Sequence, residues 1–167
     1  TDAGVHAKGM VCHLTTDREL PLSAWREGLN RFLPATIVVR SAEIVADDFH
    51  ARFSAKRKLY RYTLLCDEIR SPLQRHGCWQ IRQKLDLTAM QSAAEKFVGE
   101  HDFAAFRTTG CGAETTRRQI FSIELVVAGN LLHIDVCGSG FLKNMVRMMV
   151  GTLVEIGRGK RPAEDVS

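Results

Sequence analysis

No apolar run in this chain approaches the eighteen or so residues that a membrane-spanning helix needs, and no stretch has the pattern of a signal peptide. The five cysteines include no C-x-x-C pair, and the six histidines fall in no H-x-E or H-E-x-x-H motif. The chain also lacks a nucleophile elbow, a phosphate-binding glycine loop followed by lysine, and the G-x-G-x-x-G spacing. Motifs thus argue against a metalloenzyme, a serine hydrolase, a P-loop protein and a dinucleotide-dependent enzyme.

The composition is that of an ordinary folded protein. With 167 residues, 45% hydrophobic and 25% charged, the chain is long enough for one domain or for two small lobes, and disorder is disfavoured. It contains no repeat and no low-complexity tract. The cysteines are odd in number and scattered, which predicts reduced thiols and a cytoplasmic protein.

The net charge is only +4, but the basic residues are grouped. The groups are Arg52, Lys56, Arg57, Lys58 and Arg61; then Arg107, Arg117 and Arg118; then Arg158, Lys160 and Arg161. Such runs suit phosphate contacts, which give affinity without sequence specificity. A solvated surface is the alternative, and the runs alone do not decide between the two.

Apolar periodicity and turn residues predict a mixture of strands and helices. Strands are predicted at 9–15, 37–44, 56–65, around 78–81, at 119–128 and at 131–137. Helices are predicted at 23–33, 86–97 and 141–156, with Ser23 and Asp86 as the N-caps of the first two. A single turn is expected at 102–106 and a polar, mobile loop at 108–118. With a hairpin around Gly129-Asn130, this order predicts a mixed sheet with helices on one face.

The first seven residues, TDAGVHA, contain a candidate catalytic acid. Asp2 is followed by small residues, and Gly4 tolerates the positive φ of a tight turn, so the carboxylate can be presented from a turn that leads into a strand. On composition alone, a solvated turn residue is the commoner interpretation of such an acid.

The helix predicted at 141–156 contains a candidate charged partner. Its first ten residues are apolar on nearly every side, so we expect the helix to be buried, with Arg147 in its middle. No carboxylate lies one turn away, and a buried guanidinium without a partner is costly. Arg147 therefore needs an acid from elsewhere in the fold or an anionic ligand, unless it reaches the surface or pairs with a structural acid.

The strand predicted at 56–65 contains candidate base-binding residues. At a period of two, Lys58, Tyr60 and Tyr62 share one face, and Leu59 and Arg61 share the other. Aromatic rings interleaved with cations are typical of proteins that hold extruded RNA bases, although buried tyrosine packing is the commoner meaning.

Five motifs, in this order, closely resemble the TruA family of tRNA pseudouridine synthases. They are TDAGVHA (1–7), DFHARFSA (48–55), YRY (60–62), DFAAFR (102–107) and FLxxMVR (141–147). The resemblance implies an α+β fold with a mixed, mainly antiparallel sheet and helices packed on one face. It also implies that residues 1–167 are a partial catalytic domain truncated at both ends, without the arginine that the family places directly before Thr1.

The resemblance further implies the conversion of uridine to pseudouridine at positions 38–40 of the tRNA anticodon stem-loop. It implies no cofactor, no essential metal and a homodimer. Base flipping is expected because C1′ and C5 are inaccessible in a stacked stem, and no membrane association is expected because no apolar run is long enough to span a bilayer. By motif position, Asp2 matches the catalytic aspartate, Arg147 the arginine that pairs with it, and Tyr60 the active-site tyrosine.

Basic side chains complete this interpretation, in which they hold the anticodon arm. These are Arg52, Lys58, Arg61 and Lys143. Two alternatives remain: a non-catalytic RNA-binding module, for which the basic runs and the tyrosines would suffice, and a structural domain in which Asp2 and Arg147 form an ordinary ion pair.

Overall fold

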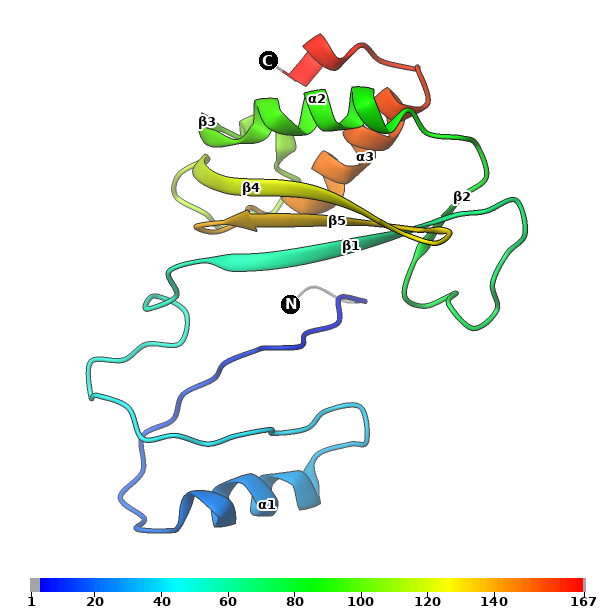
Figure 1. Cartoon of the computed structure of the whole chain (residues 1–167). Helices are drawn as coiled ribbons and strands as arrows, with labels where there is room; N and C mark the ends of the chain where they lie inside the picture. The colour runs from blue at the N-terminus through cyan, green and yellow to red at the C-terminus, as the bar shows by residue number, and fades with distance from the viewer. Residues whose placement is uncertain (1–3, 167) are drawn as a thin grey trace. The chain divides into compact units, whose positions relative to one another are not determined.

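A computed structural model describes residues 4–166 of the chain (Figure 1). The chain divides into two compact units, Thr1–Ala55 and Lys56–Ser167. Within the described residues, no helix is long and apolar enough to cross a membrane.

Among its described residues, 4–55, the first unit contains one regular element, the helix α1 (Leu22–Phe32). The prediction of this helix is confirmed, but its N-cap is Pro21 rather than Ser23, which lies inside the first turn. The helix ends before Pro34, as expected, because proline cannot continue the backbone hydrogen bonding. The Asn30 amide donates to the Val39 carbonyl oxygen at 2.9 Å and accepts from the Val39 N–H at 2.7 Å, which attaches the helix to the following segment.

The strands predicted at 9–15 and 37–44 are wrong for this structure. Both segments lack strand pairing, and their apolar side chains are exposed, for example Val11 at 58% and Ile37 at 57%. β-branched residues favour a strand only where a neighbouring strand receives the backbone hydrogen bonds and one face is covered. Neither condition is met here among the described residues.

The second unit is built on a five-stranded sheet with the order β2-β1-β5-β4-β3 (Figure 1). The strands are β1 (Lys58–Cys66), β2 (Trp79–Ile81), β3 (Gly99–Asp102), β4 (Arg117–Ala128) and β5 (Leu131–Gly138). β1 and β2 are parallel, and the other neighbouring pairs are antiparallel. The predicted mixed, mainly antiparallel sheet is therefore confirmed.

The β4–β5 hairpin is the best predicted part of the sheet. Its turn contains Gly129 with φ +62°, a conformation that glycine adopts without steric cost. Along β5, Leu132, Ile134 and Val136 are buried while the alternate residues are not, as the sequence pattern predicts. The polar strand β3 was not predicted, because its sequence GEHD carries no strand signal and forms only by pairing with the start of β4.

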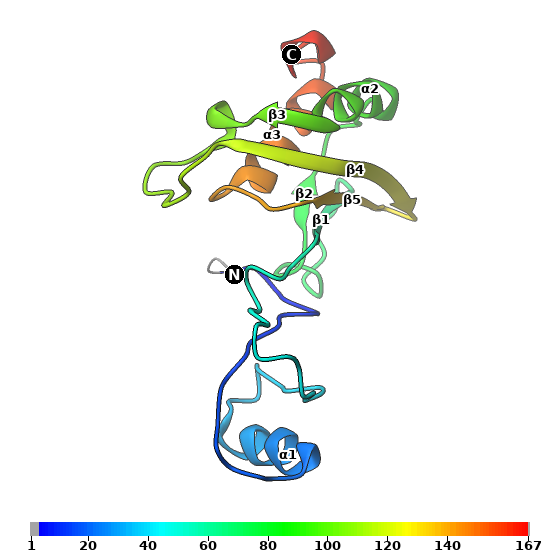
Figure 2. The same cartoon turned by 90° about the vertical axis from the view of Figure 1, so that its left-hand side faces the viewer.

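Two helices, α2 (Leu87–Phe97) and α3 (Met145–Gly157), lie on the same side of the sheet (Figures 1 and 2). Asp86 caps α2 as predicted, since its carboxylate accepts a hydrogen bond from the Ala89 N–H at 3.0 Å. α3 begins four residues later than predicted, because Asn144 has φ +60° and so interrupts the helical backbone. Short 3₁₀ turns follow at Ala104–Phe106 and Ala163–Val166.

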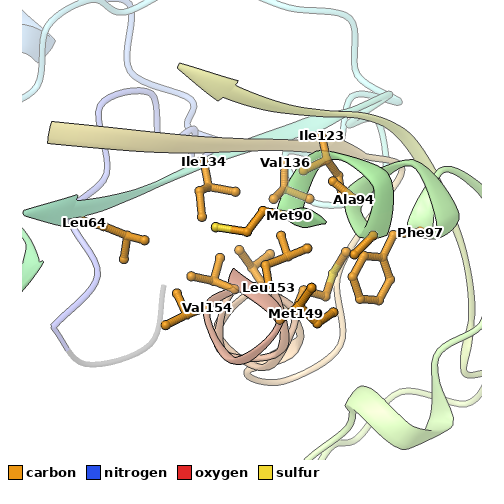
Figure 3. Close-up of a cluster of buried hydrophobic side chains, with 14 of the residues drawn as sticks. Leu64, Met90, Ala94, Phe97, Ile123, Ile134, Val136, Met149, Leu153 and Val154 are labelled. Carbon is orange, nitrogen blue, oxygen red and sulfur yellow. The ribbon is translucent and has the colours of Figure 1, made fainter. Parts of the chain in front are cut away.

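The hydrophobic core lies between the sheet and these two helices. Figure 3 shows side chains of the strands, such as Leu64 and Ile134, facing Leu153 and Val154 of α3. Burial of large aliphatic side chains contributes about 1.5–3 kcal/mol each, so this layer stabilises the second unit. The opposite face of the sheet bears polar side chains, among them Arg61 and Asp135.

Candidate active site

The predicted catalytic acid, Asp2, lies outside the described residues. Its role therefore stays a prediction, and the site is built here from the residues of the second unit.

Tyr60 lies near the start of β1, on the face that the helices cover. Its side chain is half-buried and packs against the edge of the core. The ring meets the Phe141 ring edge-to-face, with 5.2 Å between centroids and 83° between planes. Tyr60 is thus held by one aromatic neighbour and keeps part of its surface exposed to solvent.

Arg147 is exposed, so the burial expected from the apolar helix is wrong and the alternative, that this side chain reaches the surface, is confirmed. Its neighbours Met145, Val146 and Met149 are buried, because α3 packs on the sheet with those side chains. No hydrogen bond or ion pair joins Arg147 to another residue between 4 and 166. Its guanidinium can therefore receive an anion without first breaking an interaction with those residues.

Two contacts show how α3 runs relative to β1. Phe141, just before α3, contacts Tyr60 near the start of β1, and Arg158, just after α3, lies over Trp79, which pairs with Leu64 near the end of β1. α3 therefore runs along β1 in the same direction.

One side of α3 borders β1. Arg147, Gly151, Val154 and Arg158 recur at spacings that place them on one side of a helix. Val154 is buried and faces Leu64 (Figure 3), so this side packs against β1 there. Arg147 and Gly151 are not buried, so the same side is open to solvent toward the start of the helix. Tyr60 and Arg147, predicted from separate motifs, therefore belong to one region of the molecule.

The predicted RNA-binding arginine Arg61 lies on the other face of the sheet and already has a partner. Its Nε and Nη2 donate to the two carboxylate oxygens of Asp135 at 2.7 and 2.6 Å. This bidentate hydrogen bonding, together with the charge of Arg61, holds the pKa of Asp135 below its usual value. The structure thus separates Arg61 from Tyr60 by the thickness of the sheet.

The other predicted RNA-binding residues are exposed. Lys58 starts β1 and pairs in register with Gly138. Arg52 belongs to the first unit, where its guanidinium lies 5.5 Å from the centre of the Phe53 ring.

Lys143 attaches a loop to the start of α3. Its Nζ donates to the Thr109 carbonyl oxygen at 3.4 Å, and its own carbonyl oxygen accepts from the Thr108 hydroxyl at 3.3 Å. Asn144 adds a third link, because its amide donates to the Thr108 hydroxyl oxygen at 3.2 Å. The loop predicted to be mobile is therefore fastened to α3 at this point.

Cys111, on the same loop, was missed by sequence reasoning. Hydrogen bonds from the backbone N–H groups of Lys143 and Ala113 lower the pKa of this thiol, and the charges of Arg107 and Arg118 lower it further. The two arginines therefore lie near the start of α3. Their grouping with Lys143 depends on the loop contact, which no local sequence signal reveals.

No group of three or more histidine, cysteine, aspartate or glutamate side chains that could hold a metal ion occurs within residues 4–166. This region instead contains a partly exposed tyrosine, an arginine that is unpaired among residues 4–166, and a basic loop. Such an arrangement can hold an aromatic base and its phosphates.

Comparisons with known proteins decide the family. Residues 93–167 match the family model described as tRNA pseudouridine synthase. The chain is 59% identical over 167 residues to the tRNA pseudouridine synthase A of Geobacter sp. (strain M21), with 100% of this chain and 68% of the relative covered. The chain belongs to the tRNA pseudouridine synthase family.

Other members of this family are also similar along the whole chain. The tRNA pseudouridine synthase A of Syntrophotalea carbinolica is 58% identical over 99% of this chain and 66% of its own length. The enzyme of that name from Acetivibrio thermocellus is 43% identical, with 99% and 68% covered. The chain thus spans about two thirds of the length of these pseudouridine synthases.

Proposed function

We propose that this protein isomerises uridine to pseudouridine in tRNA, at positions 38–40 of the anticodon stem-loop. The observation that carries the proposal is the identity of 58–59% with tRNA pseudouridine synthase A proteins along nearly the entire chain. The five family motifs, Asp2 included, fall within that aligned length.

Asp2 is the proposed catalytic carboxylate. Breaking the N1–C1′ bond of uridine develops positive charge on the sugar, which a nearby anion stabilises. The carboxylate either attacks C1′ and holds the sugar while uracil turns, or removes the C2′ proton. In the first route, bonding of C5 to C1′ displaces the carboxylate; in the second, the proton returns to C2′ as C5 bonds to C1′. In both routes the C5 proton then leaves and N1 takes up a proton, so the uracil is rearranged with no atom lost.

Arg147 is the proposed partner of Asp2. Because Arg147 is exposed and has no acidic partner between residues 4 and 166, it can pair with a carboxylate presented by the TDAGVHA segment. The positive charge would keep the acid ionised in a site that excludes water. The pairing is therefore proposed because Arg147 is accessible to an acid, and not because a buried guanidinium would require one.

Tyr60 is proposed to stack on the extruded uracil. C1′ and C5 are inaccessible in a stacked stem, so the target nucleotide must be flipped out. An aromatic ring with an exposed surface is suited to receive it, and the edge-to-face contact with Phe141 holds the Tyr60 ring in place.

The basic side chains are proposed to bind the phosphates of the anticodon arm. Lys58, Lys143 and Arg52 are exposed and suited to this role. Arg61 could contribute only by sharing or leaving Asp135, so we expect a smaller part for it.

We also propose that the protein acts as a cytoplasmic homodimer. All five cysteines are free thiols, which is the usual state in a reducing compartment. Light scattering coupled to size exclusion tests the dimer.

The experiment that tests the function is tritium release from tRNA labelled at C5 of uridine. Asp2→Asn should abolish release while tRNA binding survives, because the amide cannot act as a nucleophile or a base. The control is Asp17→Asn, which removes the same charge from an exposed residue of the same unit. Full release by Asp2→Asn removes Asp2 from the mechanism; binding without release by the unmodified protein identifies a non-catalytic RNA-binding module.

A further inference from the structure

A second aromatic cluster lies further along β1, and the proposed chemistry does not use it. The rings of Tyr62 and Trp79 meet edge-to-face, with 6.4 Å between centroids and 77° between planes. The Arg158 guanidinium lies 6.0 Å from the centre of the Trp79 ring. The three residues come from β1, β2 and the C-terminal end of α3.

Contacts within the described residues leave part of Trp79 exposed and the charge of Arg158 without a carboxylate partner. Trp79 is 38% exposed, although it stands on the face of the sheet that the helices cover. Arg158 has no carboxylate partner within residues 4–166, and its Nε is buried without a hydrogen-bond acceptor among them. The charge of this guanidinium is thus not neutralised by a carboxylate among these residues, so it favours an anionic ligand.

The cluster and the proposed catalytic region lie toward opposite ends of the same side of α3. Arg147 and Arg158 lie eleven positions apart on that side, which corresponds to about 16 Å along the helix axis. Between them Gly151 has no side chain, and a Cβ placed there would meet nothing within 4 Å. The surface next to Arg147 is therefore open, and a nucleic-acid strand that reaches Arg147 meets no bulky side chain at Gly151.

The charge of this strip matches the phosphate backbone. Both of its ends bear an arginine without an acidic partner among the described residues. Its nearest acid on α3, Glu155, is taken up by Arg161 at 3.4 Å. Arginine suits such a site because its planar guanidinium can bind a phosphate and stack on an aromatic ring at the same time.

We propose that Trp79 and Arg158 form a second nucleotide subsite, a proposal that rests on the proposed function. A neighbouring unstacked nucleotide of the anticodon loop places its base on the exposed part of the Trp79 indole, and Arg158 binds its phosphate. The edge-to-face contact with Tyr62 holds the indole in place. Stacking on an aromatic ring tolerates any base, so the subsite adds affinity and register rather than sequence specificity.

The test uses the fluorescence of Trp79 itself. The chain has two tryptophans, so Trp25→Phe leaves Trp79 as the single indole without altering the cluster. This variant is titrated with an anticodon stem-loop RNA, while binding is followed separately by the anisotropy of a label on the RNA. We expect Trp79 emission to fall with the same midpoint as the anisotropy change. The reciprocal variant Trp79→Phe, in which only Trp25 emits, should show no such change.

A charge variant tests the arginine. Arg158→Gln should weaken RNA binding roughly 10-fold, as expected for a phosphate contact with an adjoining stacked base. Arg82→Gln removes the same charge from an exposed residue that directly follows β2, and it should leave the affinity unchanged. Melting temperatures of both variants verify that they are folded.

The outcomes separate this proposal from the proposed function. RNA binding and tritium release with unchanged Trp79 emission would overturn the subsite and leave the enzyme assignment intact. Binding with quenching but without tritium release would support the subsite and overturn the enzyme assignment. A complete absence of RNA binding would overturn both.

Discussion

The ring of Tyr60 contacts the ring of Phe141 edge-to-face at 5.2 Å between centroids, and this contact joins β1 to the turn that precedes α3. Tyr60 is the proposed base-stacking residue, and Arg147 lies on the helix that follows Phe141. One aromatic contact therefore positions a strand residue and the start of a helix relative to each other.

Loss of this contact should affect catalysis more than stability. Phe141→Leu keeps an apolar side chain but removes the aromatic edge, and we expect a destabilisation of about 1 kcal/mol. Tyr60 would lose its fixed orientation, so kcat for tritium release should fall, while the melting temperature should fall by only a few degrees. Phe121→Leu, at an exposed phenylalanine of β4, is the matched control and should retain kcat. Equal kcat values in the two variants would contradict a positioning role for Phe141.

Two substitutions of Asn144 separate the effect of its backbone conformation on stability from the effect of its hydrogen bond. Its φ of +60° suits glycine, whereas a side chain other than asparagine or aspartate pays for that conformation. Asn144→Ala should therefore be about 1 kcal/mol less stable than Asn144→Gly in urea unfolding, although both lose the hydrogen bond to Thr108.

Hydrogen exchange in the loop tests whether the hydrogen bond between Asn144 and Thr108 holds the loop in place. Both Asn144 variants, and Thr108→Val, should increase amide hydrogen exchange in residues 108–112, because each removes the link between the loop and α3. Exchange rates that stay unchanged in all three variants would mean that Lys143 alone holds the loop.

The Arg61–Asp135 pair should make stability depend on pH. Because the folded pKa of Asp135 is lowered, its stabilising contribution is complete above the usual aspartate value of about 3.9 and is lost as the pH falls through the lowered pKa. Asp135→Asn should thus unfold more easily than the unmodified protein at neutral pH, and the difference should shrink below about pH 4. Urea unfolding from pH 7 to pH 2 measures it. Since Arg61 is largely exposed, we expect a small difference that high salt reduces.

How well the sequence predicts each element depends on what that element needs from its surroundings. The β4–β5 hairpin and the capped helix α2 carry their own signals: alternation, a glycine turn, and Asp86 at an N-cap. The strand β3 carries none and depends on β4 for its hydrogen bonds. The segments at 9–15 and 37–44 show the reverse, because they have strand propensity but no partner in the described structure.

The residues of the candidate site also differ in how far the sequence predicts them. The motif positions name Tyr60 and Arg147, but periodicity alone cannot say which side of an apolar helix faces solvent. The loop that brings Arg107 and Arg118 to the start of α3 depends on hydrogen bonds from Lys143 and Asn144, which are more than thirty residues away from Thr108 and Thr109. Long-range contacts of this kind have no local signature in the sequence.

The exposure of Arg147 changes the expected result of removing it. A buried, paired guanidinium would make Arg147→Ala strongly destabilising, but an exposed residue without an ion pair between residues 4 and 166 should cost less than about 0.5 kcal/mol. Tritium release should nevertheless fall by a factor on the order of 100 or more, because the proposed counter-charge of Asp2 is lost. Thermal unfolding and tritium release on the same preparation test both parts.

Two further variants make this prediction specific. Arg147→Lys keeps the charge but not the planar, two-pronged geometry, so it should recover only part of the activity. Arg70→Ala removes an exposed arginine from the loop between β1 and β2 and should leave release unchanged. A large drop in melting temperature for Arg147→Ala would show that the side chain is buried against a part of the protein outside residues 4–166. Unchanged release at an unchanged melting temperature would remove Arg147 from the site.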